Sequence, residues 1–123
     1  SLWKNGRKAM IKKSILIIDD DIILLKTAEE ILSDLYSVSV AKGGKQGITL
    51  LKKGIIPNLI LLDIAMPEMD GYMTLEKIKG ISGCEEVPVK SVYLIATRDL
   101  SNLWLQFFYL KIKGLCDFLR KRF

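Results

Sequence analysis

The chain has 123 residues, the length of one domain, and half of them are hydrophobic, so it can bury a core and is not composed like a disordered segment. Its apolar stretches are far shorter than the roughly 20 residues needed to cross a bilayer, and no signal-peptide pattern opens it, so we expect a cytoplasmic protein with no membrane partner. It has no histidine, which excludes histidine-based catalytic triads and metal sites.

The net charge of +5 is concentrated at the two ends of the sequence. Basic residues dominate 1–13 and 111–123, whereas 14–110 carry more acidic than basic side chains. A duplex-binding protein would instead place a basic stripe across its folded body, so direct nucleic-acid binding is not expected. Cys84 and Cys116 fit neither a disulfide framework nor a metal-ligand spacing, and we expect both to be reduced and structural.

The first residues differ in pattern from the rest of the chain. Residues 1–12 show no clear period, and we expect them to be an N-terminal extension or a remnant of cloning. No internal repeat, linker or low-complexity tract follows. We therefore expect a single domain over 13–123.

Five short segments of this domain are predicted as strands. The runs 14–18, 59–62 and 92–96 are continuous and apolar, which is typical of strands covered by helices on both faces. Residues 37–40 alternate serine and valine, as expected of an edge strand with one wet face. Residues 115–119 are the expected last strand.

Segments with helical periodicity separate these strands. They cover 22–36, 44–53, a stretch that ends before Gly80, and 102–113. Four residues of the first segment form one apolar stripe: Leu24, Ala28, Ile31 and Leu35. The second segment places Ile48 and Leu51 on one side, and the third does the same with Tyr72, Leu75 and Ile78. Strands that alternate with helices predict a doubly wound α/β sheet, whose functional crevice lies beyond the carboxyl ends of its strands.

Acidic residues occupy these strand ends. Asp19, Asp20 and Asp21 follow the first strand, and Asp63 follows the third. If these strands are neighbours in a parallel sheet, their ends lie roughly 5 Å apart, and the crowded carboxylates need a cation or shifted pKa values. Mg²⁺ prefers a few carboxylates together with water and phosphate oxygens. An aspartate in this position also caps the following helix, which is a sufficient explanation for Asp21 alone.

Two segments carry a resemblance to a known family. ILIIDDD at 15–21 and LILLDIAMPEMDG at 59–71 resemble the first and third strand motifs of two-component response-regulator receiver domains, the chemotaxis-regulator-like group. The resemblance extends over about 13–123. It implies a flavodoxin-like fold with a five-stranded parallel sheet in the order 2-1-3-4-5.

The resemblance also implies a role for each site residue. Asp63 corresponds to the phosphoacceptor, Asp20 to a direct Mg²⁺ ligand, Asp19 to a ligand acting mainly through water, and Ala65 to a ligand through its backbone carbonyl. Lys121 corresponds to the lysine that contacts a phosphate oxygen. Two further residues correspond to the family's switch, Thr97 through its hydroxyl and Phe118 through its ring. A register one residue earlier puts Ala96 in place of Thr97, and the two registers stay open.

The C-terminal part departs from the family pattern in two places. Arg122 stands where the family has a proline after a cis peptide bond, and we expect a trans bond here because a non-proline cis bond costs about 2.5–4 kcal/mol. The sequence stops at Phe123, where the family continues into a fifth helix. An uncovered sheet face would expose apolar surface, so self-association, for example as a homodimer, is a further expectation.

Taken together, the motifs predict a signalling module rather than an enzyme. A histidine kinase or phosphotransfer protein is the expected phosphoryl donor, and self-phosphorylation and self-dephosphorylation are the only activities expected. One alternative is a degenerate receiver that binds proteins or dimerises without phosphorylation. Another is a Mg²⁺-dependent phosphatase, although Ala65 occupies the position of its second aspartate. The cognate kinase, the output and an attached effector domain are not readable from these residues.

Overall fold

We analysed a computed structural model of the chain, in which residues 3–4, 7–8, 12–63 and 71–92 are described. Two very short strands, β1 (Trp3–Lys4) and β2 (Arg7–Lys8), pair antiparallel as a separate ribbon. The remaining elements alternate along the chain: β3 (Ser14–Ile18), α1 (Ile22–Leu32), β4 (Ser37–Ala41), α2 (Gly44–Lys52), β5 (Leu59–Asp63), α3 (Gly71–Lys79) and β6 (Val89–Val92).

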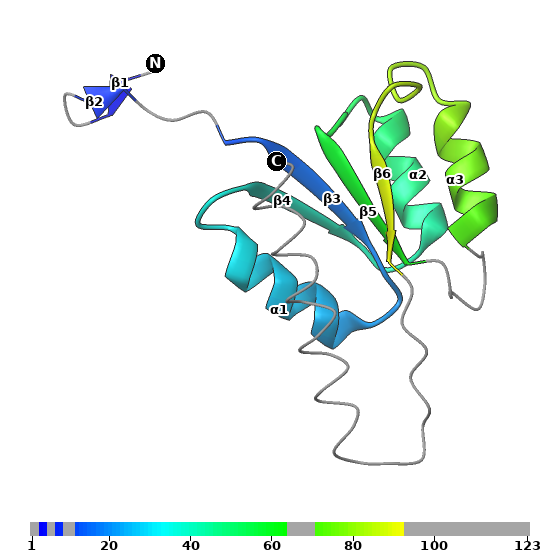
Figure 1. Cartoon of the computed structure of the whole chain (residues 1–123), viewed down its shortest axis with the longest axis horizontal. Coiled ribbons are helices and arrows are strands. Elements are labelled where there is room, and N and C mark those ends of the chain that lie inside the picture. The colour runs from blue at the N-terminus through cyan, green and yellow to red at the C-terminus, as the bar shows by residue number, and fades with distance from the viewer. Residues whose placement is uncertain (1–2, 5–6, 9–11, 64–70, 93–123) are drawn as a thin grey trace, which may run out of the picture.

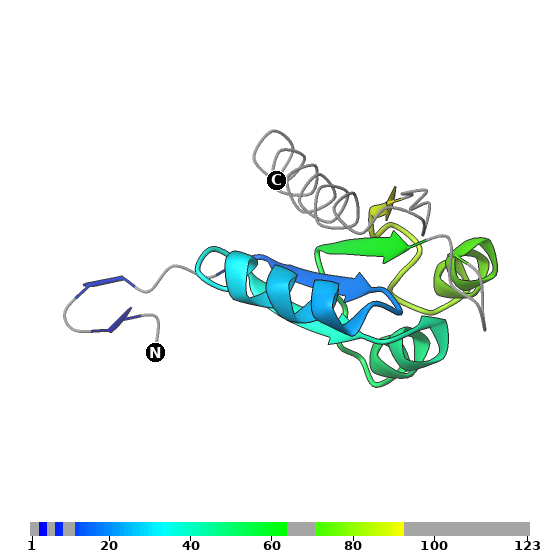
Figure 2. The ribbon, with the colours of Figure 1, turned by 90° about the horizontal axis from the view of Figure 1, so that it is seen from below.

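The four longer strands form one parallel sheet in the order β4-β3-β5-β6. Figures 1 and 2 show α1 on one face of this sheet, and α2 and α3 on the other. Counted from β3, the order is 2-1-3-4, which confirms the flavodoxin-like arrangement for the described part of the chain. The segments expected as a last helix and strand, 102–113 and 115–119, lie outside the described residues.

The side chains of β3 alternate between two hydrophobic cores. Ile15 and Ile17 belong to the core beneath α1, whereas Leu16 and Ile18 belong to the core beneath α2 and α3. All four are almost completely buried. This burial on both faces explains why β3 and β5 are continuous apolar runs rather than alternating ones.

Helix α1 buries a different stripe from the predicted one. Leu24 and Ala28 are buried as expected, but Leu25 and Leu32 accompany them, whereas Ile31 and Leu35 are 47% and 71% exposed. Ile31 lies inside the helix but to one side of the buried stripe, whereas Leu35 is exposed because the helix ends at Leu32 rather than near residue 36. Ser33 caps its end, and the turn that follows carries Leu35 away from the core.

The other helices match the prediction more closely. Ile48 and Leu51 of α2 are buried, and α2 ends at Lys52, one residue earlier than expected. In α3, Ile78 is buried but Tyr72 is 70% exposed, and the small side chain of Thr74 is buried instead. Tyr72 was therefore wrongly assigned to the apolar side.

The edge strand β4 agrees with its prediction, whereas β6 begins earlier than predicted. β4 is at the edge of the described sheet, as predicted for 37–40. β6 begins at Val89 instead of residue 92, because the β5 pairing reaches back to Val89 and the N–H of Ile60 donates to the carbonyl of Pro88 at 3.0 Å. The charged side chain of Lys90 interrupts the apolar run, so the start of β6 was not predicted from the sequence. Residues 93–96 lie outside the described part.

Candidate metal centre

The parallel register of β3 and β5 places two acidic residues side by side. Ile18 pairs with Leu62, so Asp19, directly after β3, and Asp63, the last residue of β5, follow that pair side by side at the carboxyl edge of the sheet. Neighbouring strands in a sheet are roughly 4.8 Å apart. Asp19 and Asp63 are 44 residues apart in the sequence, and the parallel pairing of β3 and β5 brings them together, as the sequence motifs predicted.

Asp20 completes the cluster. One carboxylate oxygen from each of Asp19, Asp20 and Asp63 lies within 4.8 Å of the other two. Asp19 is 2% and Asp63 8% exposed, whereas Asp20 is open to solvent. The predicted gathering of these three side chains is therefore confirmed; this group, called the acidic pocket below, has two buried members and one exposed member.

Backbone hydrogen bonds hold the Asp19 carboxylate in place. The N–H of Asp19 donates to the carbonyl of Ala41 on β4 at 3.1 Å. Oδ1 of Asp19 accepts a hydrogen bond from the N–H of Asp21 at 2.9 Å. The contact with Ala41 could not be found from the sequence, because it involves only main-chain atoms and depends on the strand order.

The third consecutive aspartate serves the helix. Oδ1 of Asp21 accepts hydrogen bonds from the N–H groups of Ile23 at 3.0 Å and Leu24 at 3.2 Å, which makes Asp21 the N-cap of α1. This confirms the capping explanation for Asp21. Its carboxylate is engaged with the start of α1, and Asp21 is not part of the cluster.

The donor set fits a hard divalent cation. Three close carboxylates carry up to three negative charges in a partly dry pocket, and their repulsion falls when a cation lies between them. Mg²⁺ bonds oxygen at 2.0–2.1 Å in an octahedron, so two of its ligands are at most about 4.2 Å apart. The three oxygens, each within 4.8 Å of the other two, are therefore near enough to face one such ion together.

The remaining predicted site residues cannot be placed. Ala65, Thr97 with its alternative Ala96, Phe118 and Lys121 all lie outside the described residues. Among the described residues, no helix is long and apolar enough to cross a membrane. Cys84 is buried and free of a disulfide, as expected, whereas Cys116 lies outside the described part.

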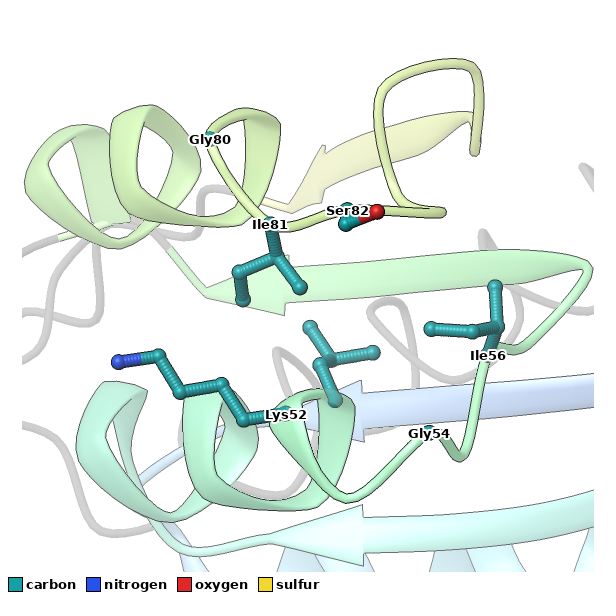
Figure 3. Close-up of a pocket in the computed structure, with 7 residues that line it drawn as sticks. Lys52, Gly54, Ile56, Gly80, Ile81 and Ser82 are labelled. Atoms are coloured by element: carbon teal, nitrogen blue, oxygen red, sulfur yellow. The ribbon is translucent and has the colours of Figure 1, made fainter.

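A hollow of about 400 Å³ lies between the C-terminal ends of α2 and α3. In Figure 3, the side chains of Ile56 and Ile81 project into it, while the side chain of Lys52 extends away along α2. Ile56 precedes β5, so this hollow is at the opposite end of the strand from Asp63. It has an apolar lining without converging polar groups, and nothing in it competes with the acidic pocket as a reactive site.

Comparison with known proteins agrees with this geometry. The model of the response regulator receiver domain family matches residues 15–123. A probable transcriptional regulator ycf27 of Cyanophora paradoxa is 33% identical over 92 residues, which cover 74% of this chain and 36% of that protein. The nitrate/nitrite response regulator protein NarL of Escherichia coli K12 is 41% identical over 75 residues, which cover 57% of this chain and 34% of NarL. The chain thus spans about a third of the length of these relatives.

Solved structures show the same fold. A CheY-like response regulator receiver domain protein from Methanospirillum hungatei JF-1 superposes with a TM-score of 0.70 at 25% identity, covering 91% of this chain and 94% of that one. The chemotaxis protein CheY4 of Vibrio cholerae gives a TM-score of 0.72 at 18% identity, covering 92% and 100%. The family match over 15–123, the strand order and the acidic pocket agree, and the chain belongs to the response regulator receiver domain family of two-component systems.

Proposed function

We propose that the chain is a phosphorylation switch in which Asp63 accepts a phosphoryl group from a phosphohistidine of a histidine kinase or phosphotransfer protein. The observation that carries this proposal is the meeting of Asp19, Asp20 and Asp63 in one pocket at the carboxyl edge of the sheet. The proposal treats 13–123 as the receiver domain and 1–12 as an extension before it, within a cytoplasmic protein.

The chemistry assigned to Asp63 is nucleophilic. One of its carboxylate oxygens attacks phosphorus, the bond from phosphorus to the donor imidazole nitrogen breaks, and the products are an acyl phosphate and a free imidazole. Asp63 is 8% exposed, which leaves it a narrow opening toward a donor. Because its main chain is fixed in β5 between β3 and β6, the nucleophile is held on a rigid element.

Asp19 and Asp20 are assigned to the cation. With the backbone carbonyl of Ala65, they and Asp63 would hold Mg²⁺, which supplies positive charge to offset that of the phosphoryl oxygens. Buried Asp19, held by the N–H of Asp21, would act mainly through a bound water, and exposed Asp20 would be a direct ligand. Lys121 is assigned to a phosphate oxygen, and Thr97 and Phe118 to the switch that reads the modification.

A phosphoryl label tests the proposal. The wild-type protein incubated with Mg²⁺ and radiolabelled acetyl phosphate is expected to take up label that hydroxylamine releases, as an acyl phosphate does. Asp63→Asn should take up none, and chelation of Mg²⁺ should reduce labelling of the wild type at least 10-fold. Asp34→Asn is the matched control, because Asp34 is an exposed aspartate beyond the C-terminal end of α1, away from the pocket.

Two results would overturn the assignment. Equal labelling of Asp63→Asn and wild type would show that the phosphoryl group goes elsewhere. Absence of labelling together with no spectral change on addition of Mg²⁺ and beryllium fluoride, a phosphoryl mimic, would instead favour a receiver that binds partners without phosphorylation.

A further inference from the structure

The edge strand β4 directs part of its backbone outward. The N–H of Ser37 donates to the carbonyl of Lys13, and the carbonyl of Ala41 accepts from the N–H of Asp19, so the odd-numbered residues of β4 bond toward β3. In a strand, neighbouring residues point their N–H and C=O groups to opposite sides. Val38 and Val40 therefore direct theirs away from the sheet, and within the described part of the chain no strand pairs with that side.

This edge lacks three features that commonly prevent strand pairing. Natural edge strands carry lysine, proline or a bulge. β4 has the sequence Ser-Val-Ser-Val-Ala, with no charge and no proline, and it pairs with β3 through five consecutive residues without a bulge. The core beneath α1 includes residues of both β3 and β5, and Val38 and Val40 of β4 pack against it while staying only partly buried.

The geometry points to a second copy of this chain as the occupant of the edge, with the two β4 strands antiparallel and a two-fold axis at Ser39. In this register Val38 lies opposite the partner's Val40, and Val40 opposite the partner's Val38. Each of these two pairs exchanges two backbone hydrogen bonds, four in all, because both residues point outward. This inference is independent of the phosphorylation proposed for Asp63.

The alternation of β4 makes it complementary to itself. Val38 and Val40 pack on the α1 face, where the antiparallel register sets valine beside valine. Ala41 belongs to the opposite core, and on that face the register sets Ser39 beside its own copy. A parallel pair cannot be two-fold symmetric, since the bonding residues of one strand lie opposite non-bonding residues of the other.

Cysteine cross-linking tests the register. Ser39→Cys would face its own copy in a non-hydrogen-bonded pair with Cα atoms about 4.5 Å apart, within the range that a disulfide bridges. Ser37→Cys is the matched control, because four residues of strand would separate it from its copy by roughly 13 Å. Under mild oxidation, Ser39→Cys should form a covalent dimer at least 10-fold faster than Ser37→Cys. It should also exceed the wild type at least 10-fold, and the wild type measures any cross-linking through the natural thiols of Cys84 and Cys116. Equal rates for the two variants would overturn the inference.

A second pair of variants tests the edge without added thiols. Val40→Pro removes an outward N–H and leaves the bonds of β4 to β3 in place, whereas Val40→Ala removes similar packing and keeps the N–H. Sedimentation should show weak, concentration-dependent dimers for the wild type and Val40→Ala, and monomers for Val40→Pro with unchanged circular dichroism. A wild type that stays monomeric at millimolar concentration would contradict the inference, and slow amide exchange at Val38 and Val40 in that monomer would show that the chain itself covers the edge.

Discussion

The main-chain N–H of Asp21 donates a hydrogen bond to Oδ1 of Asp19 at 2.9 Å, so the first aspartate of the triplet is positioned by the third. The side chain of Asp21 meanwhile caps α1 through Ile23 and Leu24. Three identical residues in a row therefore divide between the acidic pocket and helix capping. This division makes their substitutions distinguishable.

Substitutions at Asp20 and Asp21 should have opposite consequences. Asp20→Asn removes a charge from the exposed member of the acidic pocket, so the affinity for Mg²⁺ should fall at least 10-fold with little change in the free energy of unfolding. Asp21→Ala removes the N-cap of α1 and should lower the free energy of unfolding by about 1 kcal/mol while Mg²⁺ affinity changes less than 3-fold. Calorimetric titration and urea unfolding measure the two quantities. If both variants lost the same affinity, Asp21 would belong to the cation site after all.

Asp63→Asn should uncouple the stability of the protein from Mg²⁺. The substitution removes a carboxylate from the acidic pocket at nearly constant volume, so the variant should lose the stabilisation that Mg²⁺ gives the wild type. Added Mg²⁺ should stabilise the wild type by about 2.7 kcal/mol at 100 times its Kd and the variant much less. Thermal unfolding with and without the ion makes the comparison. If Mg²⁺ did not change the thermal unfolding of the wild type, the cation assignment would lose its basis.

Gly47→Ala should disturb the residue that precedes the pocket. An added Cβ at Gly47 would lie 2.6 Å from Cδ1 and 3.0 Å from Cγ1 of Ile18, which is completely buried. Overpacking costs about 1–3 kcal/mol, and the better helix propensity of alanine returns about 1 kcal/mol, so a net loss of about 1 kcal/mol is expected.

Ile18→Val supplies the control for Gly47→Ala because it deletes the Cδ1 methyl that clashes. Alone it should cost about 0.5–1.5 kcal/mol. The double variant should lose clearly less free energy of unfolding than the sum of the losses of the two single variants, and a double-mutant cycle measures this difference. Strict additivity would mean that the two side chains do not meet.

The thiol of Cys84 should make stability depend on alkaline pH. Burial raises its pKa above the ordinary value of 9.0, Glu85 raises it further, and Lys79 partly opposes them. Because the folded pKa is the higher one, the native state retains a proton that the unfolded state loses, so stability is full below about pH 9 and declines as the pH rises through the folded pKa. Urea unfolding from pH 7 to 10 should show a steeper decline for the wild type than for Cys84→Ala. Parallel curves would indicate that Cys84 ionises alike in both states.

The elements that sequence analysis predicted well are those with a strong local signal. The apolar runs of β3 and β5 and the aspartates that follow them are local patterns, and their meeting in space follows from the parallel topology. Residues 14–18 matched the observed strand at both ends. The acidic pocket was predictable for the same reason.

The errors arose where the outcome depends on what surrounds a residue. Helix periodicity continued to Leu35, but α1 ends at Leu32 and the turn at Ser33 and Asp34 redirects the chain, a signal that the apolar spacing outweighed. Tyr72 has the spacing of a core residue and is nevertheless exposed, and Thr74 of the same helix is buried instead. The contact between Asp19 and the carbonyl of Ala41 leaves no trace in residue identity at all.

The two-core alternation of β3 has an evolutionary consequence. Aliphatic residues can be exchanged for one another between Ser14 and Asp19, because each merely has to fill its own core. Insertion or deletion of one residue would send every later side chain to the wrong face and rotate Asp19 out of the pocket. Across descendants of this sequence, the number of residues from Ser14 to Asp19 should consequently vary far less than the residue types at these positions.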